Sequence, residues 1–479
     1  MKQAKYLLLA TLIAVLICFF NLPIVTHAHV PTEGTRHSPS LLAINPGQFA
    51  TFIEADGLYR QGEFDSAAQL YRQVKPAFAN HPITAAPAPV YEATSLSATN
   101  LTTWNNAQAA LESENTELAV SSLQQVATSQ PEFIPGVLQL AEQLNNSDRE
   151  DEAIELLDGA ATLYPGSADV VMAQVQTLAA AGEHIEASIA AREFAILHLD
   201  HPQAGDFEDL AEDEFKAFSK KRKRDSIIGG VTNIVVGIFT GNKVPWESWD
   251  SAVDTYEVED LMLSNEKRFG AKAAEQYVEQ LSILEDPEVT DYVTQLGMEV
   301  ARPMGRDFDY EFYVVQDNTM NAFALPGGKI FVNTGLIRAT RSQAELAGVL
   351  AHEAAHSVLS HGIQGFFRDD TLSQLGEQVP FGDFVTTLIS LNYSRQQERQ
   401  SDILGTRVLS TAGYAADGLR NFMATLTQNT SSPQIEYFST HPTSAARVTY
   451  LEELIQRNGY NRYALEGVDK HSEIQQRLS

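Results

Sequence analysis

Residues 351–356 read Ala351-His352-Glu353-Ala354-Ala355-His356, an HExxH pattern. Its two histidines are four residues apart, so on a helix they lie one turn apart on the same face. Two imidazoles placed in this way can bind one tetrahedral Zn²⁺ ion. Glu353 stands next to the first histidine, where it can take a proton from a water that attacks a peptide carbonyl. The apolar periodicity before the motif predicts a helix over residues 342–361.

A catalytic zinc site also needs a third protein ligand and an open fourth position. Downstream, Glu398 and Asp402 are four residues apart in a segment with helical periodicity. Glu398 can be the third ligand, and Asp402 can accept a hydrogen bond from the far ring nitrogen of a ligand histidine. The same residues also fit solvated helix faces, so the surrounding sequence has to decide between the two interpretations.

Composition narrows the class of protein. The chain has 479 residues, with 62 acidic and 33 basic side chains and a net charge of -29. A nucleic-acid-binding protein would need a basic surface, so we expect no nucleic-acid partner. The single cysteine, Cys18, excludes an internal disulfide framework and zinc sites built from several cysteines.

The N-terminus resembles a targeting segment. Lys2 and Lys5 precede an apolar run over residues 6–20, and Ala28 follows at a suitable cleavage point. Residues 1–28 are therefore predicted to be a signal peptide or a membrane anchor, which implies an extracytoplasmic location such as the periplasm. Residues 29–47, rich in Pro, Ser, Thr and His, are predicted to be a flexible leader.

A repeat is visible between residues 48 and 202. Ala119, Ala153 and Ala187 follow one another at steps of 34 residues, and Pro131 and Pro165 share this step. The spacing resembles the tetratricopeptide repeat, in which two antiparallel helices cross at a small residue. The alternative is an ordinary helical bundle in which the spacing is accidental.

The same part of the chain is strongly acidic. Residues 29–215 hold 28 acidic and 6 basic residues, a net charge of -22. This region therefore carries either a solvated acidic face or a surface that binds a protein partner.

Residues 203–255 are predicted to be a linker. They contain the basic run Lys220-Lys221-Arg222-Lys223-Arg224 and an apolar segment over 227–241. Fifteen residues are too few to span a bilayer. The basic run beside an apolar segment predicts either a contact with an anionic membrane surface or a packed connection between domains.

The C-terminal half mixes strand and helix patterns. Residues 311–316 and 329–333 read as strands, and Pro326-Gly327-Gly328 reads as a turn between them. The predicted fold is therefore mainly α: a helical repeat array, then an α+β domain of the zincin type with a small β-sheet over 256–465, then a tail over 466–479.

Taken together, these motifs resemble the zinc metalloproteases that include the CaaX prenyl protease, the HtpX heat-shock protease and the periplasmic BepA-type proteases. The resemblance covers about residues 257–455. This chain departs from the family in two respects. Ser401 stands where the family usually has Ala before the Asp, and the predicted repeats precede the protease domain, whereas the periplasmic type carries them after it. The motifs that carry the resemblance are Leu284-Glu285-Asp286-Pro287, Asn321-Ala322-Phe323-Ala324-Leu325-Pro326-Gly327-Gly328, Glu345-Leu346-Ala347-Gly348-Val349-Leu350-Ala351-His352-Glu353, Arg395-x-x-Glu398-x-x-x-Asp402, and Ser439-Thr440-His441-Pro442 with Arg447.

The resemblance implies a role for each matched position. One Zn²⁺ per chain would be held by His352, His356 and Glu398, with Glu353 as the general base. Asp402 would contact a ligand histidine. His441 would face the metal, either to stabilise the oxyanion or to occupy the open position in a resting form. Arg447 would support the loop of His441, unless it forms only a surface salt bridge, and His361 is expected to be a structural neighbour.

The resemblance also implies a place for the substrate. The strand over 329–333 would be the edge of the sheet and would receive an extended chain by β-augmentation. The residues expected at this edge are Asn321, Ala322, Lys329, Ile330 and Phe331.

The function that the resemblance implies is hydrolysis of internal peptide bonds by a metal-activated water, in quality control of unfolded or misassembled envelope proteins. The alternative is a repeat-based adaptor or chaperone whose protease domain is dormant or self-blocked.

Overall fold

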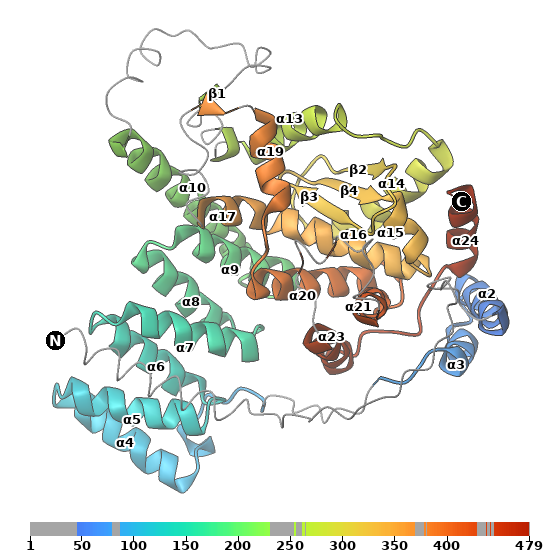
Figure 1. Ribbon diagram of the computed structural model, residues 1–479. Helices are drawn as coiled ribbons and strands as arrows, with labels where there is room; N and C mark the ends of the chain where they lie inside the picture. Colours follow the sequence, from blue (N-terminus) through green and yellow to red (C-terminus); the bar gives the residue numbers. More distant parts are fainter. Residues whose placement is uncertain are drawn as a thin grey trace, which may run out of the picture. The chain divides into compact units, whose positions relative to one another are not determined.

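A computed structural model describes residues 46–78, 87–229, 253–254, 261–263, 265–368, 378–379, 381–428, 437, 441 and 445–478 (Figure 1). The predicted targeting segment 1–28 lies outside these residues, as do nearly all of the predicted leader and most of the apolar segment 227–241. The described chain is mainly helical with one small three-stranded sheet, which confirms the predicted fold class. Among the described helices, none combines the length and the apolar character needed to cross a membrane.

The first two helices in the described part of the chain form a hairpin, α2 (Pro46–Arg60) and α3 (Phe64–Val74). Its buried Asp56 accepts a hydrogen bond from the Tyr71 hydroxyl at 2.5 Å, and also from the backbone N–H groups of Glu466 and Val468, at 3.0 Å each. The sequence assigns this segment to the repeat array. The structure packs it instead on the C-terminal end of the chain, next to α24 (Val468–Arg477).

The helices of the N-terminal array repeat with a regular step. Helices α5, α7 and α9 begin at Thr116, Glu150 and His184, which are 34 residues apart, and each helix packs on the next along the chain. The alanines that carry the repeat occupy the fourth position of these helices and are fully buried, so side chains there cannot be large where the helices meet. The array consists of α4 (Ala98–Glu112), α5 (Thr116–Ser129), α6 (Ile134–Asn145), α7 (Glu150–Leu163), α8 (Ala168–Ala181) and α9 (His184–Leu197), preceded by the short η1 (Ala93–Ser95).

The predicted linker 203–255 begins as a long helix, α10 (Ala204–Gly229), which packs on α9. Its buried side chains Phe207, Ala211 and Phe218 repeat at helical spacing, a signal that the charged residues between them obscure in the sequence. Part of the basic run is used in packing. The Lys221 ammonium donates to the carbonyl of Gly182 at 2.9 Å, where it neutralises the negative end of α8. The Arg222 guanidinium lies 4.9 Å from the centre of the Phe367 ring.

The sheet of the C-terminal half has the strand order β2-β4-β3 (Figure 1). β2 (Glu311–Val315) is parallel to β4 (Lys329–Asn333), and β3 (Ala322–Leu325) is antiparallel to it. The turn between β3 and β4 needs positive φ angles, 74° at Gly327 and 81° at Gly328, which glycine adopts without strain. The two predicted strands thus correspond to β2 and β4, and β3 was missed.

The predicted substrate edge is wrong for Lys329, Ile330 and Phe331. β4 has a neighbour on both sides and is therefore the central strand, whose backbone groups are already paired. Ile330 and Phe331 are fully buried, and the buried Lys329 ammonium donates to the Asp309 carbonyl at 2.6 Å. The edge strands are β2 and β3.

Helices pack around this sheet, and their buried side chains form the main core of the domain together with those of the strands (Figure 1). α14 (Pro287–Ala301) packs on β2, and α16 (Gln343–Val358) packs on β3. α20 (Arg395–Thr411) and α21 (Gly418–Gln428) pack on α16 from outside. The remaining elements are β1 (Val253–Asp254) paired with β5 (Gln378–Val379), α13 (Glu266–Val278), η3 (Arg302–Met304), α15 (Thr334–Ala339), α17 (His361–Arg368), α19 (Phe381–Ser390) and α23 (Ala445–Arg457).

Residues 466–479 differ from the predicted tail, because most of them form α24. Val468, His471 and Ile474 share one face of this helix and are buried. A stripe of three residues is too short to stand out in a sequence, so the sequence does not predict this helix.

The buried His471 makes stability depend on pH. The Tyr292 hydroxyl lies 2.7 Å from His471 Nδ1, and the Thr340 carbonyl lies 3.0 Å from Nε2, an arrangement that suits the neutral ring. Burial lowers the pKa of His471 to about 4. Because the unfolded chain binds this proton more tightly, the stabilising contribution is complete above the ordinary pKa of about 6.5 and is lost as pH falls toward 4.

We expect His471→Gln to reduce the loss of unfolding free energy between pH 7.5 and pH 4 by about 3 kcal/mol, from a pKa difference of roughly 2.5 units. Glutamine can keep one acceptor and one donor in place without titrating. Urea unfolding of both proteins at the two pH values measures the difference. Equal losses in variant and wild type would contradict the assignment.

Candidate metal centre

Helix α16 carries the HExxH motif, and its two ends are fixed locally. The Ser342 side chain accepts a hydrogen bond from the backbone N–H of Glu345 at 3.2 Å and so caps the first turn. The helix ends at Val358, and Ser360 has a positive φ of 57°. The chain reverses there, and His361 becomes the first residue of α17, so the predicted single helix over 342–361 is two helices.

Two glycines let neighbouring helices approach α16 closely. A Cβ atom at Gly405 of α20 would lie 3.1 Å from the backbone nitrogen of His352, and one at Gly348 would lie 2.6 Å from the backbone nitrogen of Leu419. Helix α20 begins with a capping box, in which Ser394 and Gln397 satisfy each other's backbone N–H groups. The cap and the close approach together bring Glu398 and Asp402 against the histidines of α16.

Four buried side chains converge in the centre: His352, His356, Glu398 and His441. The Nε2 atoms of His352 and His356 are 3.1 Å apart. Each of them lies 3.6 Å from an oxygen of Glu398. His441 Nδ1 lies 3.4 Å from His352 Nε2 and 2.8 Å from Glu398 Oε1.

This donor set fits zinc. Ligand atoms about 2.0–2.2 Å from a tetrahedral Zn²⁺ are separated from one another by about 3.3–3.6 Å, which the observed distances approach. Imidazole nitrogens and a carboxylate are borderline donors that zinc accepts readily. Burial and the neighbouring histidines lower the pKa of His356, so its ring is neutral and a nitrogen lone pair is available for a metal.

The far nitrogen of His352 faces a carboxylate. His352 Nδ1 lies 3.1 Å from Asp402 Oδ1, and Arg447 donates to both oxygens of Asp402, at 3.0 and 2.7 Å. Burial alone would raise the pKa of Asp402, but the Arg447 charge and the hydrogen bonds lower it to about 2. Asp402 is therefore an anion that orients His352 and favours its role as a ligand. Arg447 also pairs with Glu398, so it is more than a surface residue.

Glu353 points to the same centre without belonging to the ligand group. Its Oε1 accepts a hydrogen bond from the Tyr437 hydroxyl at 3.0 Å, and its buried Oε2 has no hydrogen-bond partner among the described residues. Burial raises the pKa of Glu353, against the opposing effect of His441 and His352. A carboxylate whose pKa is raised toward neutrality suits a general base.

The sequence does not predict the contacts that three residues make at the site: Tyr437, Tyr393 and His361. The Tyr437 ring stacks on His441 with centroids 4.4 Å apart, and the Tyr393 ring lies 3.8 Å from that of His356. Tyr437 and His441 are four residues apart and joined by a backbone hydrogen bond, a spacing that could have indicated their contact. His361, expected to be a neighbour only, places its Nδ1 3.0 Å from His356 Nδ1.

The structure thus brings together most of the residues that the sequence predicts for the site. His352, Glu353, His356, Glu398, Asp402, His441 and Arg447 form one cluster. Asn321 and Ala322 lie at the start of the edge strand β3, close to the centre, because the backbone of Tyr437 donates to the carbonyl of Met320. Lys329, Ile330 and Phe331 lie in β4 and are separate from the cluster.

Two histidines one helical turn apart, a glutamate between them and a carboxylate from a second helix define a metal centre of the HExxH class. The sequence comparisons agree. Residues 285–455 match the model of Peptidase family M48. The M48 match and the donor set together support zinc as its metal.

Three relatives show how far the similarity extends. The mitochondrial metalloendopeptidase OMA1 of Schizosaccharomyces pombe is 28% identical over 211 residues, which cover 40% of this chain and 62% of that protein. The beta-barrel assembly-enhancing protease of Yersinia pestis is 25% identical over 238 residues, 45% of this chain and 49% of that protein. The mitochondrial metalloendopeptidase OMA1 of Arabidopsis thaliana is 32% identical over 151 residues, 30% and 31% of the two chains. The matched segments thus cover between 31% and 62% of the length of these relatives, less than two thirds in each case.

Proposed function

We propose that the chain is a zinc-dependent endopeptidase. The observation that carries the proposal is the buried convergence of His352, His356 and Glu398 with Glu353 beside them. The M48 domain and the relatives named as metalloendopeptidases support it.

The chain's own residues supply the acid–base chemistry. When bound, zinc would lower the pKa of a water to about 7 and polarise a peptide carbonyl. Glu353 takes one proton of the water as the water oxygen forms the new C–O bond, and it delivers that proton to the leaving amine nitrogen as the C–N bond breaks. The Tyr437 hydroxyl holds the Glu353 carboxylate through its hydrogen bond to Oε1.

The substrate is proposed to pair with β3. In the described residues β3 has a strand on one side only, whereas β4 is paired on both. The β3 residues Ala324 and Leu325 line a small cavity beside His356, so a chain paired along β3 would pass the metal centre. Asn321 and Ala322 then mark the start of the substrate edge.

An unfolded probe protein tests the proposed activity. We expect the full chain to cut β-casein at internal peptide bonds, which mass spectrometry of the products will locate. Products shortened only from their ends, or hydrolysis of esters without cleavage of any peptide bond, would point to a different hydrolase.

We also propose a resting form that blocks itself, which the position of His441 supports. His441 Nδ1 stands among the ligand atoms, so the fourth position that catalysis needs is filled by the protein. His441 Nδ1 also lies 2.8 Å from Glu398 Oε1, and this closed arrangement is the proposed self-blocked state of the alternative function.

We expect His441→Ala to raise β-casein cleavage by about ten- to a hundredfold, the factor being the reciprocal of the fraction of molecules in the open state. The variant should keep its zinc, because three ligands remain. If cleavage instead falls by about a hundredfold or more, His441 stabilises the oxyanion and does not block the site.

The finer assignments remain proposals. We propose an extracytoplasmic location and quality control of misassembled envelope proteins, which the name of the beta-barrel assembly-enhancing protease of Yersinia pestis supports. The array α4–α9, with its acidic composition, is the proposed site for a protein partner. The proposed membrane contact at the basic run is weakened by the packing of Lys221 and Arg222.

A further inference from the structure

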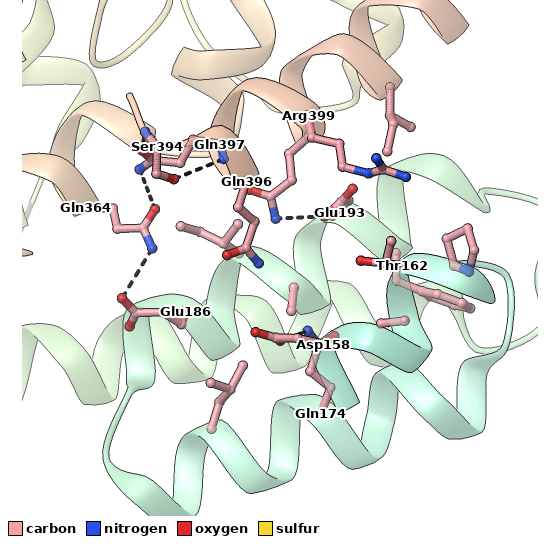
Figure 2. Close-up of a pocket in the computed structure, with 18 of the residues that line it drawn as sticks. Asp158, Thr162, Gln174, Glu186, Glu193, Gln364, Ser394, Gln396, Gln397 and Arg399 are labelled. Atoms are coloured by element: carbon pink, nitrogen blue, oxygen red, sulfur yellow. Dashed lines mark hydrogen bonds between the residues drawn. The ribbon is translucent and has the colours of Figure 1, made fainter. Parts of the chain in front are cut away.

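The repeat array contacts the catalytic helices directly, and these contacts surround a pocket of about 340 Å³. Figure 2 shows Glu186 and Glu193 of α9 on one side of this pocket, opposite Gln364 of α17 and the first turn of α20. Gln364 Nε2 donates to Glu186 at 3.2 Å, and Gln400 Nε2 donates to Glu193 at 2.8 Å. Gln400 lies two residues from the metal ligand Glu398.

The contact at Glu193 continues to a second metal ligand. Gln400 Oε1 lies 3.1 Å from His361 Nε2, and His361 Nδ1 lies 3.0 Å from His356 Nδ1. Glu193, Gln400, His361 and His356 thus form a continuous hydrogen-bonded chain from the array to the metal centre.

The direction of each hydrogen bond follows from the metal. A neutral His356 that offers the lone pair of Nε2 carries its proton on Nδ1, so Nδ1–H donates to Nδ1 of His361. His361 must then carry its proton on Nε2, which donates to the side-chain carbonyl of Gln400. The Gln400 amide group has its N–H left to donate to Glu193, which is the bond observed. One assignment of protons satisfies all three links.

Each of the two ligand histidines of α16 therefore has a carboxylate behind it. For His352 the contact is direct, and for His356 it runs through other side chains. His352 faces the carboxylate of Asp402 directly. His356 faces a neutral imidazole, and the carboxylate at the end of its chain belongs to helix α9 of the array. A carboxylate behind a ligand histidine fixes the ring orientation and raises its basicity, an effect that hydrogen-bond chains can transmit.

We propose that Glu193, acting through Gln400 and His361, is a positioning residue for the metal ligand His356, so that the docked array completes the zinc site. This inference rests on the proposed zinc site. It makes the N-terminal array part of the metal centre as well as a surface for partners, and it predicts that disturbing the α9–α20 contact weakens zinc binding.

Zinc affinity of the full chain, measured by competition with a chromophoric chelator, tests this without using activity. We expect Glu193→Gln to weaken zinc binding by about tenfold and His361→Phe by up to about a hundredfold. Glu186→Gln is the matched control, because it makes the same change of side chain on the same helix and pocket wall. Its partner Gln364 leads to Gln397 and not to the ring of His361, so its affinity should stay within about twofold of wild type.

A charge swap separates positioning from packing. In the double variant Glu193→Gln with Gln400→Glu, the carboxylate moves one link closer to His361 while every hydrogen bond can still form. We expect it to restore wild-type zinc affinity or better, with an unfolding temperature of the zinc-free protein equal to that of Glu193→Gln.

The outcomes keep the two proposals apart. If wild type binds one zinc and Glu193→Gln binds it equally well, or if Glu186→Gln weakens binding as much, the positioning role is wrong and the peptidase proposal stands. If wild type binds no zinc, the proposed function itself fails.

Discussion

Glu353→Gln is expected to lower cleavage of an unfolded protein by about a thousandfold or more, within the range that general bases contribute. The amide cannot take a proton from the attacking water, but it has nearly the same shape. Its oxygen can still accept the hydrogen bond of the Tyr437 hydroxyl, so the fold around it is retained. Product formation from β-casein, followed by gel or mass spectrometry, measures the effect.

The control for this variant is its metal content. Glu353 is outside the group of ligand atoms, so the variant should bind as much zinc as wild type. A variant with full zinc and undiminished cleavage would show that Glu353 is not the base. A dormant domain, the alternative function, predicts instead that wild type and variant are equally inactive.

Lys75→Met is expected to destabilise the protein by about 3–5 kcal/mol, the cost of leaving buried charges without their partner. The Lys75 ammonium is fully buried between Asp417, at 2.6 Å, and Glu466, and it also donates to the Arg462 carbonyl. Burial would lower the pKa of Lys75, but the two carboxylates raise it, so the lysine is charged in the folded state. Urea unfolding at neutral pH measures the loss.

The matched control is Lys470→Met on the surface of α24. Its side chain is half exposed and, among the residues that the structure describes, pairs with the exposed Glu473, so the expected change is within about 0.5 kcal/mol. A Lys75→Met effect as small as this would mean that the N-terminal hairpin is not part of the fold of the catalytic half. Glu466 also accepts a hydrogen bond from Ser342, the cap of α16, so the Lys75 cluster supports the helix that carries the metal ligands.

The metal centre could be predicted because its residues are set by local spacing. His352 and His356 share a helix face, as do Glu398 and Asp402, and such i,i+4 pairs are readable in a sequence. The 34-residue step was readable for the same reason, since Ala119 and Ala153 repeat within regular helices. What the spacing could not show was which residues of different helices meet.

The sequence-based predictions are wrong or incomplete where contacts between distant parts of the chain determine the structure. The strand order that puts β4 in the centre depends on β3, a four-residue strand that is buried throughout and lacks alternation. The placement of Lys75 beside Asp417 and Glu466 joins residues more than 340 positions apart, and no local pattern encodes it. The contact of His361 with His356 could not be predicted, because it depends on the chain reversal at Ser360, which turns the His361 ring toward His356.

The most direct test of the central claim is zinc stoichiometry and cleavage measured on one sample of the full chain. We predict one zinc per chain, loss of β-casein cleavage when a chelator removes it, and recovery of cleavage when one equivalent of Zn²⁺ is returned. Cleavage that survives complete removal of the metal, or a purified active chain without stoichiometric zinc, would contradict the claim.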